Sequence, residues 1–364
     1  MLTSILSFLL VITIIVFIHE MGHYLAARSV GVRILEFSIG FGKALFKLKD
    51  KHGTTWKICP IPLGGYVKMY GDAGVASNAD FEKLKQLPEQ ERKQTFSMQP
   101  PLNKAYIAAA GPFANFFLAF VIFFSFSLFS GRYYIPNKVA SVQQNSPAEK
   151  AGIKIDDKII EIDGTETNSF DKIYNKVSLY PNTILSIKIE RKGITHNMKI
   201  KTAEKQVKDK NGKIAGRVGV LGIASKEPEL QNLGILDALY YAIDDVSSII
   251  STTYHALLQM VSGARSLDEL RGTITIADHS GTTLTQGLFS FIFFIAMISI
   301  NIGFVNLLPI PLLDGGHILF AFYELIIGKP PSEEVLSVVH KIGMAIIIFM
   351  FVISTSNDIK ALLF

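Results

Sequence analysis

The sequence predicts a polytopic α-helical membrane protein, with about four transmembrane helices and one small α+β domain on the outer face. Of its 364 residues, 49% are hydrophobic and only 18% are charged, whereas about 25% are charged in ordinary soluble proteins. Four apolar segments are long enough to cross about 30 Å of hydrocarbon. Between the second and third segments, short β-prone runs alternate with turn residues.

The four apolar segments are residues 3–27, 105–129, 284–308 and 335–353. The last is the weakest because His340 and Lys341 interrupt it. A shorter apolar helix over 316–327 is expected to extend the third span beyond a break.

Residues 231–265 have two interpretations, a fifth span or an amphipathic helix at the membrane interface. The segment is semi-apolar but carries Asp237, Asp244 and Asp245. We favour the interfacial helix, because three carboxylates in one span would be very costly.

Period-two alternation predicts a hairpin in the region 138–203. Leu185, Ile187 and Ile189 share one face of the run LSIKIE, and NMKIK alternates in the same way after a turn at 191–193. Such alternation is typical of strands with one buried face. With short helices at 147–151 and 169–179, this region is a compact α+β module of about 65 residues.

Composition also excludes some classes. The basic residues form no stripe with interleaved aromatics, so nucleic-acid binding is not expected. Cys59 is the only cysteine, which excludes a disulfide within one chain and a zinc site built from cysteines.

Two histidines and a glutamate lie inside the first apolar segment, in the stretch HEMGH. An ionisable group at membrane depth is costly and usually marks a functional site. His19 and His23 share one face of a helix, where they can hold one zinc ion, and Glu20 can act as general base towards water. The alternative is a set of polar residues that reach the interface from a helix end. This is disfavoured because His19 lies about 20 Å into the segment.

Catalytic zinc takes three protein ligands and keeps one open position. Asp314 is the candidate third ligand, in the stretch NLLPIPLLDGGH, where Pro309, Pro311 and two glycines must break the helix. Irregular backbone at membrane depth lines protein or a water-filled cavity, so a carboxylate there needs a partner. The alternatives are that Asp314 caps the next helix, or that His317 is the third ligand, which we rank lower.

The charge distribution gives an orientation that fits this pairing. Basic residues concentrate between the first two segments, from Arg28 to Lys104, so that loop is cytoplasmic by the positive-inside rule. The first span then runs inward, residues 130–283 lie outside, and the third span brings Asp314 to the side of His19 and His23. A fifth span at 235–261 would put Asp314 on the wrong side.

Two further places invite a functional interpretation. Asn306 is an amide at membrane depth that either holds substrate backbone or packs between helices, and Asn115 raises the same question, with a structural role favoured. The stretch WKICPIPLGGYVKMYG, with Gly64 and Gly65, predicts a hairpin at the membrane face. Its open edge could pair with an extended substrate, or it is a simple loop anchor.

At this point the sequence resembles the site-2 proteases, and closely the bacterial RseP-type regulated intramembrane metalloproteases. The resemblance covers nearly the whole chain. Its most specific stretches are HEMGH, PLGGYVKM at 62–69, AGPFANF at 110–116, RGTITIA at 271–277 and NLLPIPLLDGGH at 306–317. The run SPAEKAGIKIDDKIIEIDG also resembles a PDZ domain, although Asp156 stands where glycine is usual. The chain has room for one PDZ domain rather than two in tandem.

The resemblance implies His19, His23 and Asp314 as zinc ligands and Glu20 as the catalytic base. It implies that Asn306 helps to hold substrate, and that Gly64 and Gly65 lie in a membrane-reentrant hairpin. The implied organisation is a membrane core at 1–137 (two spans), a PDZ-like domain at 138–205, an amphipathic region at 206–283 and a second membrane core at 284–364 (two spans).

We therefore expect an intramembrane zinc endopeptidase that cleaves single-span membrane proteins, such as anti-sigma factors or remnant signal peptides, after trimming by a site-1 protease. The expected location is the bacterial inner membrane, in contact with lipid, with a periplasmic PDZ-like domain and an active site towards the cytoplasm. The alternatives are a non-catalytic PDZ adaptor on a membrane anchor with a structural metal site, and a metal transporter. An intact HExxH with Asp314 disfavours the adaptor. A transporter would carry ionisable residues on several spans.

Overall fold

The computed structural model describes residues 2–71, 87–208, 214–263 and 265–363. They fall into two compact units, each described by itself below. The first unit contains residues up to 123 together with 243–250 and 270–363, and the second contains 124–242 and 251–269.

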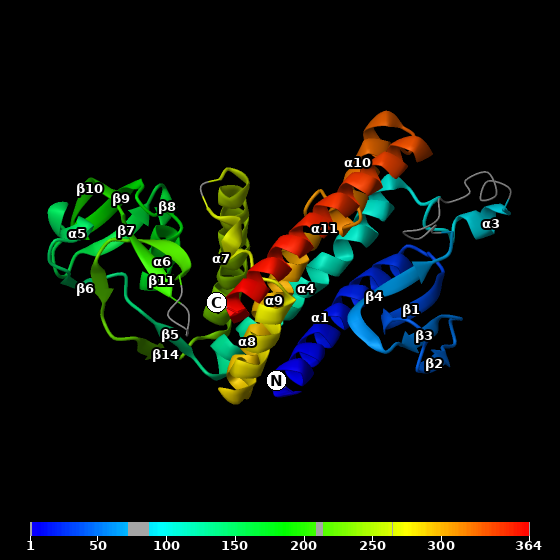
Figure 1. Ribbon diagram of the computed structural model, residues 1–364, viewed down its shortest axis with the longest axis horizontal. Helices are drawn as coiled ribbons and strands as arrows, with labels where there is room; N and C mark the ends of the chain where they lie inside the picture. Colours follow the sequence, from blue (N-terminus) through cyan, green and yellow to red (C-terminus); the bar gives the residue numbers. More distant parts are fainter. Residues whose placement is uncertain (1, 72–86, 209–213, 264, 364) are drawn as a thin grey trace. The chain divides into compact units, whose positions relative to one another are not determined.

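Each of the four predicted apolar segments is a helix (Figure 1). These are α1 (Leu2–Ser29), α4 (Pro101–Phe129), α9 (Leu288–Asn306) and α11 (Glu333–Leu363). Within the part of the chain that the structure describes, these four are long and apolar enough to cross a membrane, by length and composition. The helix α7 (Ile235–Val261) is not among them. The predicted short helix is α10 (Asp314–Ile327), which ends at Gly328 in the left-handed conformation typical of a C-terminal glycine.

The helices of the first unit pack through a small apolar cluster and close polar contacts. Val11 and Ile15 of α1 pack against Phe291 and Ile295 of α9. An additional helix, α8 (Thr273–Thr285), was not anticipated from the sequence and lies against the start of α1, where the Ser280 hydroxyl donates to the Ser4 carbonyl oxygen.

The amino end of α8 is capped from α11. The Asp358 carboxylate accepts hydrogen bonds from the backbone N–H groups of Gly272, Ile274 and Thr275. A helix start has unpaired N–H groups that need acceptors, so this buried carboxylate ties α11 to α8.

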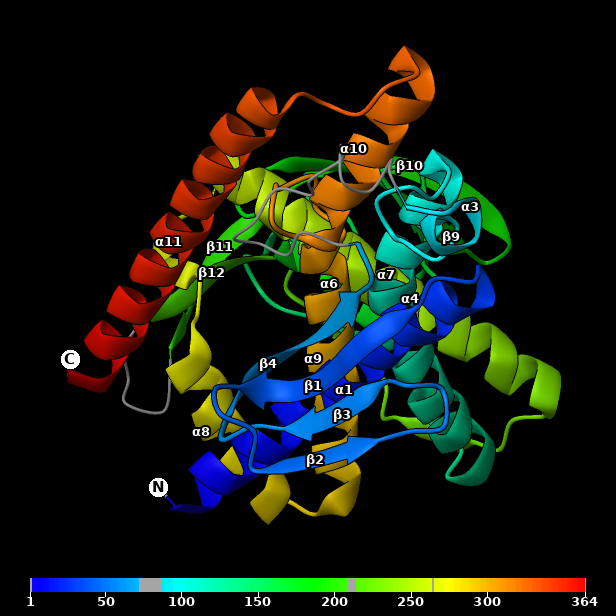
Figure 2. The ribbon, with the colours of Figure 1, turned by 90° about the vertical axis from the view of Figure 1, so that its right-hand side faces the viewer.

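A four-stranded sheet covers the second half of α1. Its strands are β1 (Ile34–Phe41), β2 (Phe46–Lys49), β3 (Thr55–Ile58) and β4 (Ile61–Met69), in the order β2-β3-β1-β4 (Figure 2). Strand β1 runs parallel to β3 and antiparallel to β4. Phe37 of β1 is fully buried and stacks on Trp56, while Tyr24 and Ala27 of α1 pack against the same cluster.

The predicted hairpin over the stretch WKICPIPLGGYVKMYG is therefore wrong, because β3 and β4 do not pair with each other. The Cys59 N–H donates to the Ile39 carbonyl oxygen, so the chain is still bonded to β1 at the turn. Pro60 has no N–H to continue a ladder, and the chain crosses to the other edge of β1. Strand β4 becomes the terminal strand of the sheet.

The second unit contains the predicted α+β module. Its main sheet has the order β10-β9-β7-β8, and the predicted hairpin is confirmed as β9 (Ile184–Arg191) and β10 (Ile194–Lys201). Leu185, Ile187 and Ile189 are almost fully buried, as the alternation predicted. The other two strands of the main sheet are β7 (Lys158–Ile162) and β8 (Thr165–Glu166), and the two short helices are α5 (Pro147–Lys150) and α6 (Phe170–Ser178). Three further pairs of strands lie outside this sheet: β6 (Val139–Val142) with β13 (Ile223–Ser225), β11 (Ala203–Lys208) with β12 (Ile214–Val220), and β5 (Arg132–Tyr134) with β14 (Glu229–Gln231).

The turn before β7 keeps the conformation that glycine usually supplies. Asp156 has a φ of 71°, in the left-handed region that aspartate tolerates better than most residues. The short helices α3 (Glu89–Arg92), in the first unit, and η1 (Leu267–Glu269), in the second, complete the described elements.

Candidate metal centre

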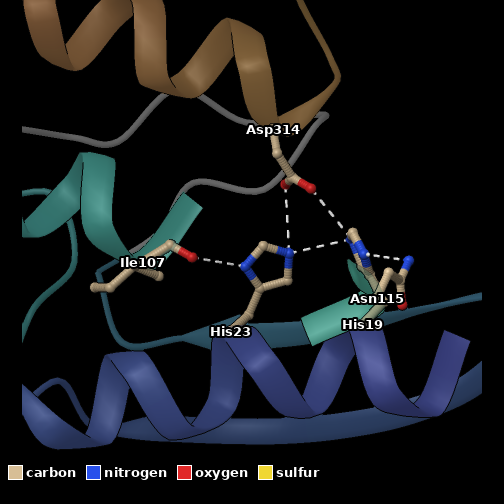
Figure 3. Close-up of polar contacts among 5 residues, drawn as sticks. All are labelled: His19, His23, Ile107, Asn115 and Asp314. Atoms are coloured by element: carbon tan, nitrogen blue, oxygen red, sulfur yellow. Dashed lines mark hydrogen bonds and ion pairs between the residues drawn. The ribbon is translucent and has the colours of Figure 1, made fainter. Parts of the chain in front are cut away.

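Three side chains from two distant parts of the sequence converge in the first unit (Figure 3). His19 and His23 lie one turn apart on α1, with their Nε2 atoms 3.2 Å from each other. Asp314, the first residue of α10, places Oδ2 3.1 Å from His19 Nε2 and Oδ1 3.4 Å from His23 Nε2. Both histidines are only 9% exposed.

The break between α9 and α10 places the carboxylate. Leu312 has a φ of 83°, a conformation that costs a branched residue energy and persists only where the surroundings impose it. A Cβ on Gly315 would lie 2.1 Å from the Leu308 carbonyl oxygen, and one on Gly316 would lie 2.7 Å from that of Ile310. The two glycines after Asp314 therefore let the new helix start directly against the break.

The contacts of His23 determine which of its two ring nitrogens presents a lone pair to the cluster. Its Nδ1 lies 2.8 Å from the Ile107 carbonyl oxygen of α4. A carbonyl can only accept, so Nδ1 carries the proton and the Nε2 of the neutral ring presents a lone pair. That lone pair faces the Asp314 carboxylate, which also has only lone pairs to offer when ionised.

This arrangement fits a cation. Asp314 Oδ2 is a buried atom with no hydrogen-bond partner, which is costly without a compensating charge. One ligand atom from each of the three residues lies within 4.8 Å of the others. Zinc bonds of about 2.1 Å separate ligand atoms by about 3.4 Å in a tetrahedral site. The two Nε2 atoms lie 3.2 Å apart, and each lies 3.1 or 3.4 Å from a different oxygen of the Asp314 carboxylate, so a small adjustment of the carboxylate would complete such a set. Three ligands with a fourth position open are what catalytic zinc takes.

Two glycines bring neighbouring elements against these side chains. A Cβ on Gly111 of α4 would lie 2.2 Å from His23 Nε2 and 2.9 Å from His19 Cε1. A Cβ on Gly65 of β4 would lie 2.9 Å from Glu20 Cγ. In the sequence, Glu20 lies between the two histidines of α1. In the structure, strand β4 packs against the Glu20 side chain at Gly65.

The other predicted residues are placed as follows. Asn306 is the last residue of α9, and Gly64 and Gly65 lie in β4. His317 lies in the first turn of α10 and is not part of the metal-capable group found in the described residues. The sequence singles out Asn115, with a structural role favoured, but it does not predict the contact of Asn115 with His19 or the close approach of Gly111 to both histidines. The signal available was a glycine and an amide four residues apart on one helix face.

Comparison with known proteins supports zinc as the metal. The model of peptidase family M50 matches residues 7–350. A protein of Rickettsia conorii, named as a zinc metalloprotease, is 40% identical over 99% of this chain and 99% of its own length. A similarly named protein of Agrobacterium fabrum is 36% identical over 99% of this chain and 96% of its own, and the metalloprotease MmpA of Caulobacter vibrioides is 33% identical over 99% and 96%.

These findings define a zinc-dependent membrane metalloprotease. The chain belongs to peptidase family M50, the site-2 protease family. Among solved structures, the PDZ domain of an SdrC-like protein from Listeria monocytogenes is 22% identical and covers 26% of this chain and 90% of its own, with a TM-score of 0.20. A TM-score this low supports no conclusion about the fold.

Proposed function

We propose that this protein is an intramembrane endopeptidase that cleaves single-span membrane proteins within or near their membrane segment. The observation that carries the proposal is the convergence of His19, His23 and Asp314 within apolar helices, with Glu20 beside them. We assign the first three residues as zinc ligands and Glu20 as the catalytic base. Bound zinc supplies Lewis-acid chemistry, which polarises a carbonyl group and makes water a better nucleophile near neutral pH.

The residues around the metal site have separate roles in the proposed reaction. The Glu20 carboxylate takes a proton from the attacking water and later delivers it to the leaving amine. The contact between His23 Nδ1 and the Ile107 carbonyl oxygen keeps the His23 ring oriented towards the cluster. Gly111 leaves the space that the two imidazoles need.

Substrate backbone must be extended before it can be cut, because a transmembrane helix has its amides paired internally. Strand β4 is the terminal strand of its sheet and passes Glu20 at Gly65. An extended segment added to this edge would lie beside the catalytic base. We propose this role for Gly64 and Gly65, and we propose that Asn306 holds the substrate backbone from the end of α9.

The remaining assignments complete the proposal. The chain crosses the bacterial inner membrane four times, with α7 outside the membrane or at its surface. The module at 138–205 is a periplasmic PDZ-like domain, and the active site faces the cytoplasm. Substrates are anti-sigma-factor-like proteins or remnant signal peptides, shortened beforehand by a site-1 protease. A non-catalytic adaptor is disfavoured because Glu20 would then have no role against the metal cluster.

The decisive test replaces Glu20 by Gln in the purified full-length protein. Zinc content per chain and cleavage of a tagged single-span reporter are measured together. We expect zinc to stay bound and cleavage to fall by at least about 100-fold, since general acid–base groups contribute roughly 10²–10⁴. Glu166→Gln, an exposed glutamate in β8, is the matched control and should behave as wild type. Unchanged cleavage by Glu20→Gln would remove the proposed mechanism.

A further inference from the structure

The two histidines of the cluster are held differently behind their rings. His23 Nδ1 faces the Ile107 carbonyl oxygen at 2.8 Å, whereas His19 Nδ1 faces the side-chain amide nitrogen Nδ2 of Asn115 at 3.3 Å (Figure 3). A carbonyl is always an acceptor, but an amide side chain offers an acceptor at one end and a donor at the other. Only the His19 contact therefore depends on a side chain that substitution can change.

Asn115 is held in place from two sides. It is fully buried on α4, and its backbone carbonyl oxygen accepts a hydrogen bond from the Ser299 hydroxyl of α9 at 2.9 Å. A Cβ on Gly303 would lie 3.2 Å from Asn115 Cβ, so α9 packs directly on this residue. The side chain is consequently fixed against His19 rather than free to turn towards solvent.

This buried amide carries a cost that packing alone does not require. Its Oδ1 atom is buried without a hydrogen-bond partner, which destabilises a protein because the desolvation of the polar atom is not compensated. An apolar side chain of similar size, such as leucine, would fill the space and avoid this cost. The presence of an amide indicates that its polar atoms are needed beside His19.

Metal binding by His19 requires one particular tautomer of its ring. For His19 to offer Nε2 as a ligand, the neutral ring must carry its proton on Nδ1. That N–H requires an acceptor, and the acceptor end of the Asn115 amide reaches it by a half-turn of the amide group, which leaves the shape of the side chain nearly unchanged.

We infer that Asn115 is a positioning residue for the metal centre, whose Oδ1 accepts a hydrogen bond from His19 Nδ1–H and so presents His19 Nε2 to the metal. It plays for His19 the part that the Ile107 carbonyl plays for His23. Outer partners of this kind fix the tautomer and orientation of metal-binding imidazoles. The inference rests on the proposed ligand role of His19 and extends it to α4.

The test uses metal affinity, measured on the full-length protein by competition with a zinc chelator. Asn115→Leu removes the acceptor and should weaken zinc binding by about 10–100-fold. Asn115→Asp keeps an acceptor and should bind zinc at least as tightly as wild type. A packing role predicts the opposite order, because leucine would be tolerated and a buried carboxylate would be the more damaging replacement.

Controls separate the outcomes. Asn103→Leu makes the same change on the same helix, at an amide that donates to Gln99 rather than to a histidine, and should leave zinc affinity unchanged. His19→Ala should lower zinc affinity. If it does not, the ligand assignment itself is wrong, whereas a loss in His19→Ala with none in Asn115→Leu overturns only the positioning role.

The cobalt-substituted protein gives a second readout, since the visible spectrum of Co²⁺ reports the ligands it holds. Asn115→Asp should keep the wild-type spectrum, and Asn115→Leu should alter it. If the leucine variant does not fold, Asn115→Asp decides alone. Wild-type or tighter zinc affinity supports the inference, and a tenfold weaker affinity contradicts it.

Discussion

Both compact units of this chain bury aliphatic side chains, but the helices of the first unit also leave large aromatic side chains exposed beside buried polar ones. In the module of the second unit, the most buried side chains are aliphatic, such as Ile159, Ile187 and Ile189, each 0% exposed. In the helices of the first unit, Phe113 and Phe117 are 60% and 65% exposed, whereas Asn115 and Asp358 are 0% and 1% exposed.

This difference in burial follows from the solvent to which each surface is suited, which is water for the module and lipid for the helices. Removing apolar side chains from water drives the folding of a soluble module. Lipid is as apolar as leucine, so membrane helices associate instead through close packing and polar contacts. The polar groups that lie between these helices need partners there, because lipid offers none, and metal ligands can be assembled in the same interior.

The largest expected effect breaks the close packing of the first unit. Gly111→Ala would place a methyl group 2.2 Å from the present position of His23 Nε2, so α4 or the imidazoles must move. Misplacement of about 1 Å costs on the order of 100-fold in catalysis. We expect zinc affinity, measured by chelator competition, and reporter cleavage to fall together by at least about 100-fold.

Gly216→Ala in the second unit is the control for this change. The nearest atom to an added Cβ there is Glu269 Cδ, at 3.6 Å, which is ordinary contact. Zinc affinity and cleavage should stay at wild-type values. A normal metal affinity in Gly111→Ala would show that the helices are not packed around the histidines as described.

A pair of large-to-small changes sharpens the comparison of the two interiors. Ile187→Ala removes methyl groups from a fully packed core and should destabilise the module by about 2–4 kcal/mol. Phe117→Ala removes a larger side chain that is 65% exposed and should change stability by less than about 0.5 kcal/mol.

Hydrogen exchange of the full-length protein in detergent measures both effects. Peptides from β9 and β10 should lose protection in Ile187→Ala, and peptides from α4 should keep it in Phe117→Ala. Equal losses in the two variants would mean that Phe117 is buried by something other than lipid or detergent, and the contrast between the units would fail.

The same contrast explains which features could be predicted. Long apolar runs predicted α1, α4 and α9, and period-two alternation predicted the burial of Leu185, Ile187 and Ile189, because these signals are local. The approach of Asp314 to His19 followed from counting spans and from the prolines that end α9.

The four-stranded sheet could not be predicted in the same way. Strand β1 lies between β3 and β4 and pairs with both, and its burial follows contacts with α1 rather than clean alternation. The parallel pairing of Phe37 with Trp56 joins strands separated by a whole intervening strand. The cap that Asp358 forms on α8 is equally non-local. No short stretch of sequence encodes these partners.

The smallest expected effect concerns a charge in the second unit, where burial of a carboxylate is offset by an ion pair. Asp157 is 1% exposed, and its Oδ2 lies 2.6 Å from Arg191 Nη2. Burial alone would raise the pKa of Asp157, but the hydrogen bonds from Arg191 and from the Lys154 N–H outweigh it and hold this pKa below its usual value.

A carboxyl group with a lowered pKa in the folded state stabilises the fold above its unfolded pKa of about 3.9 and loses this contribution as the pH falls through the folded value. Asp157→Asn should therefore destabilise the module by about 1–2 kcal/mol near neutral pH, and by less as the pH falls below about 4. Protection factors of β9 amides, corrected for intrinsic exchange at each pH, measure this difference. Asp156→Asn is the matched control, because Asp156 is 64% exposed and its ion pair with Lys138 is screened by solvent and contributes little to stability. If both variants lost protection equally at every pH, the buried pair would have no special part in the module, and burial of polar groups would be productive only in the first unit.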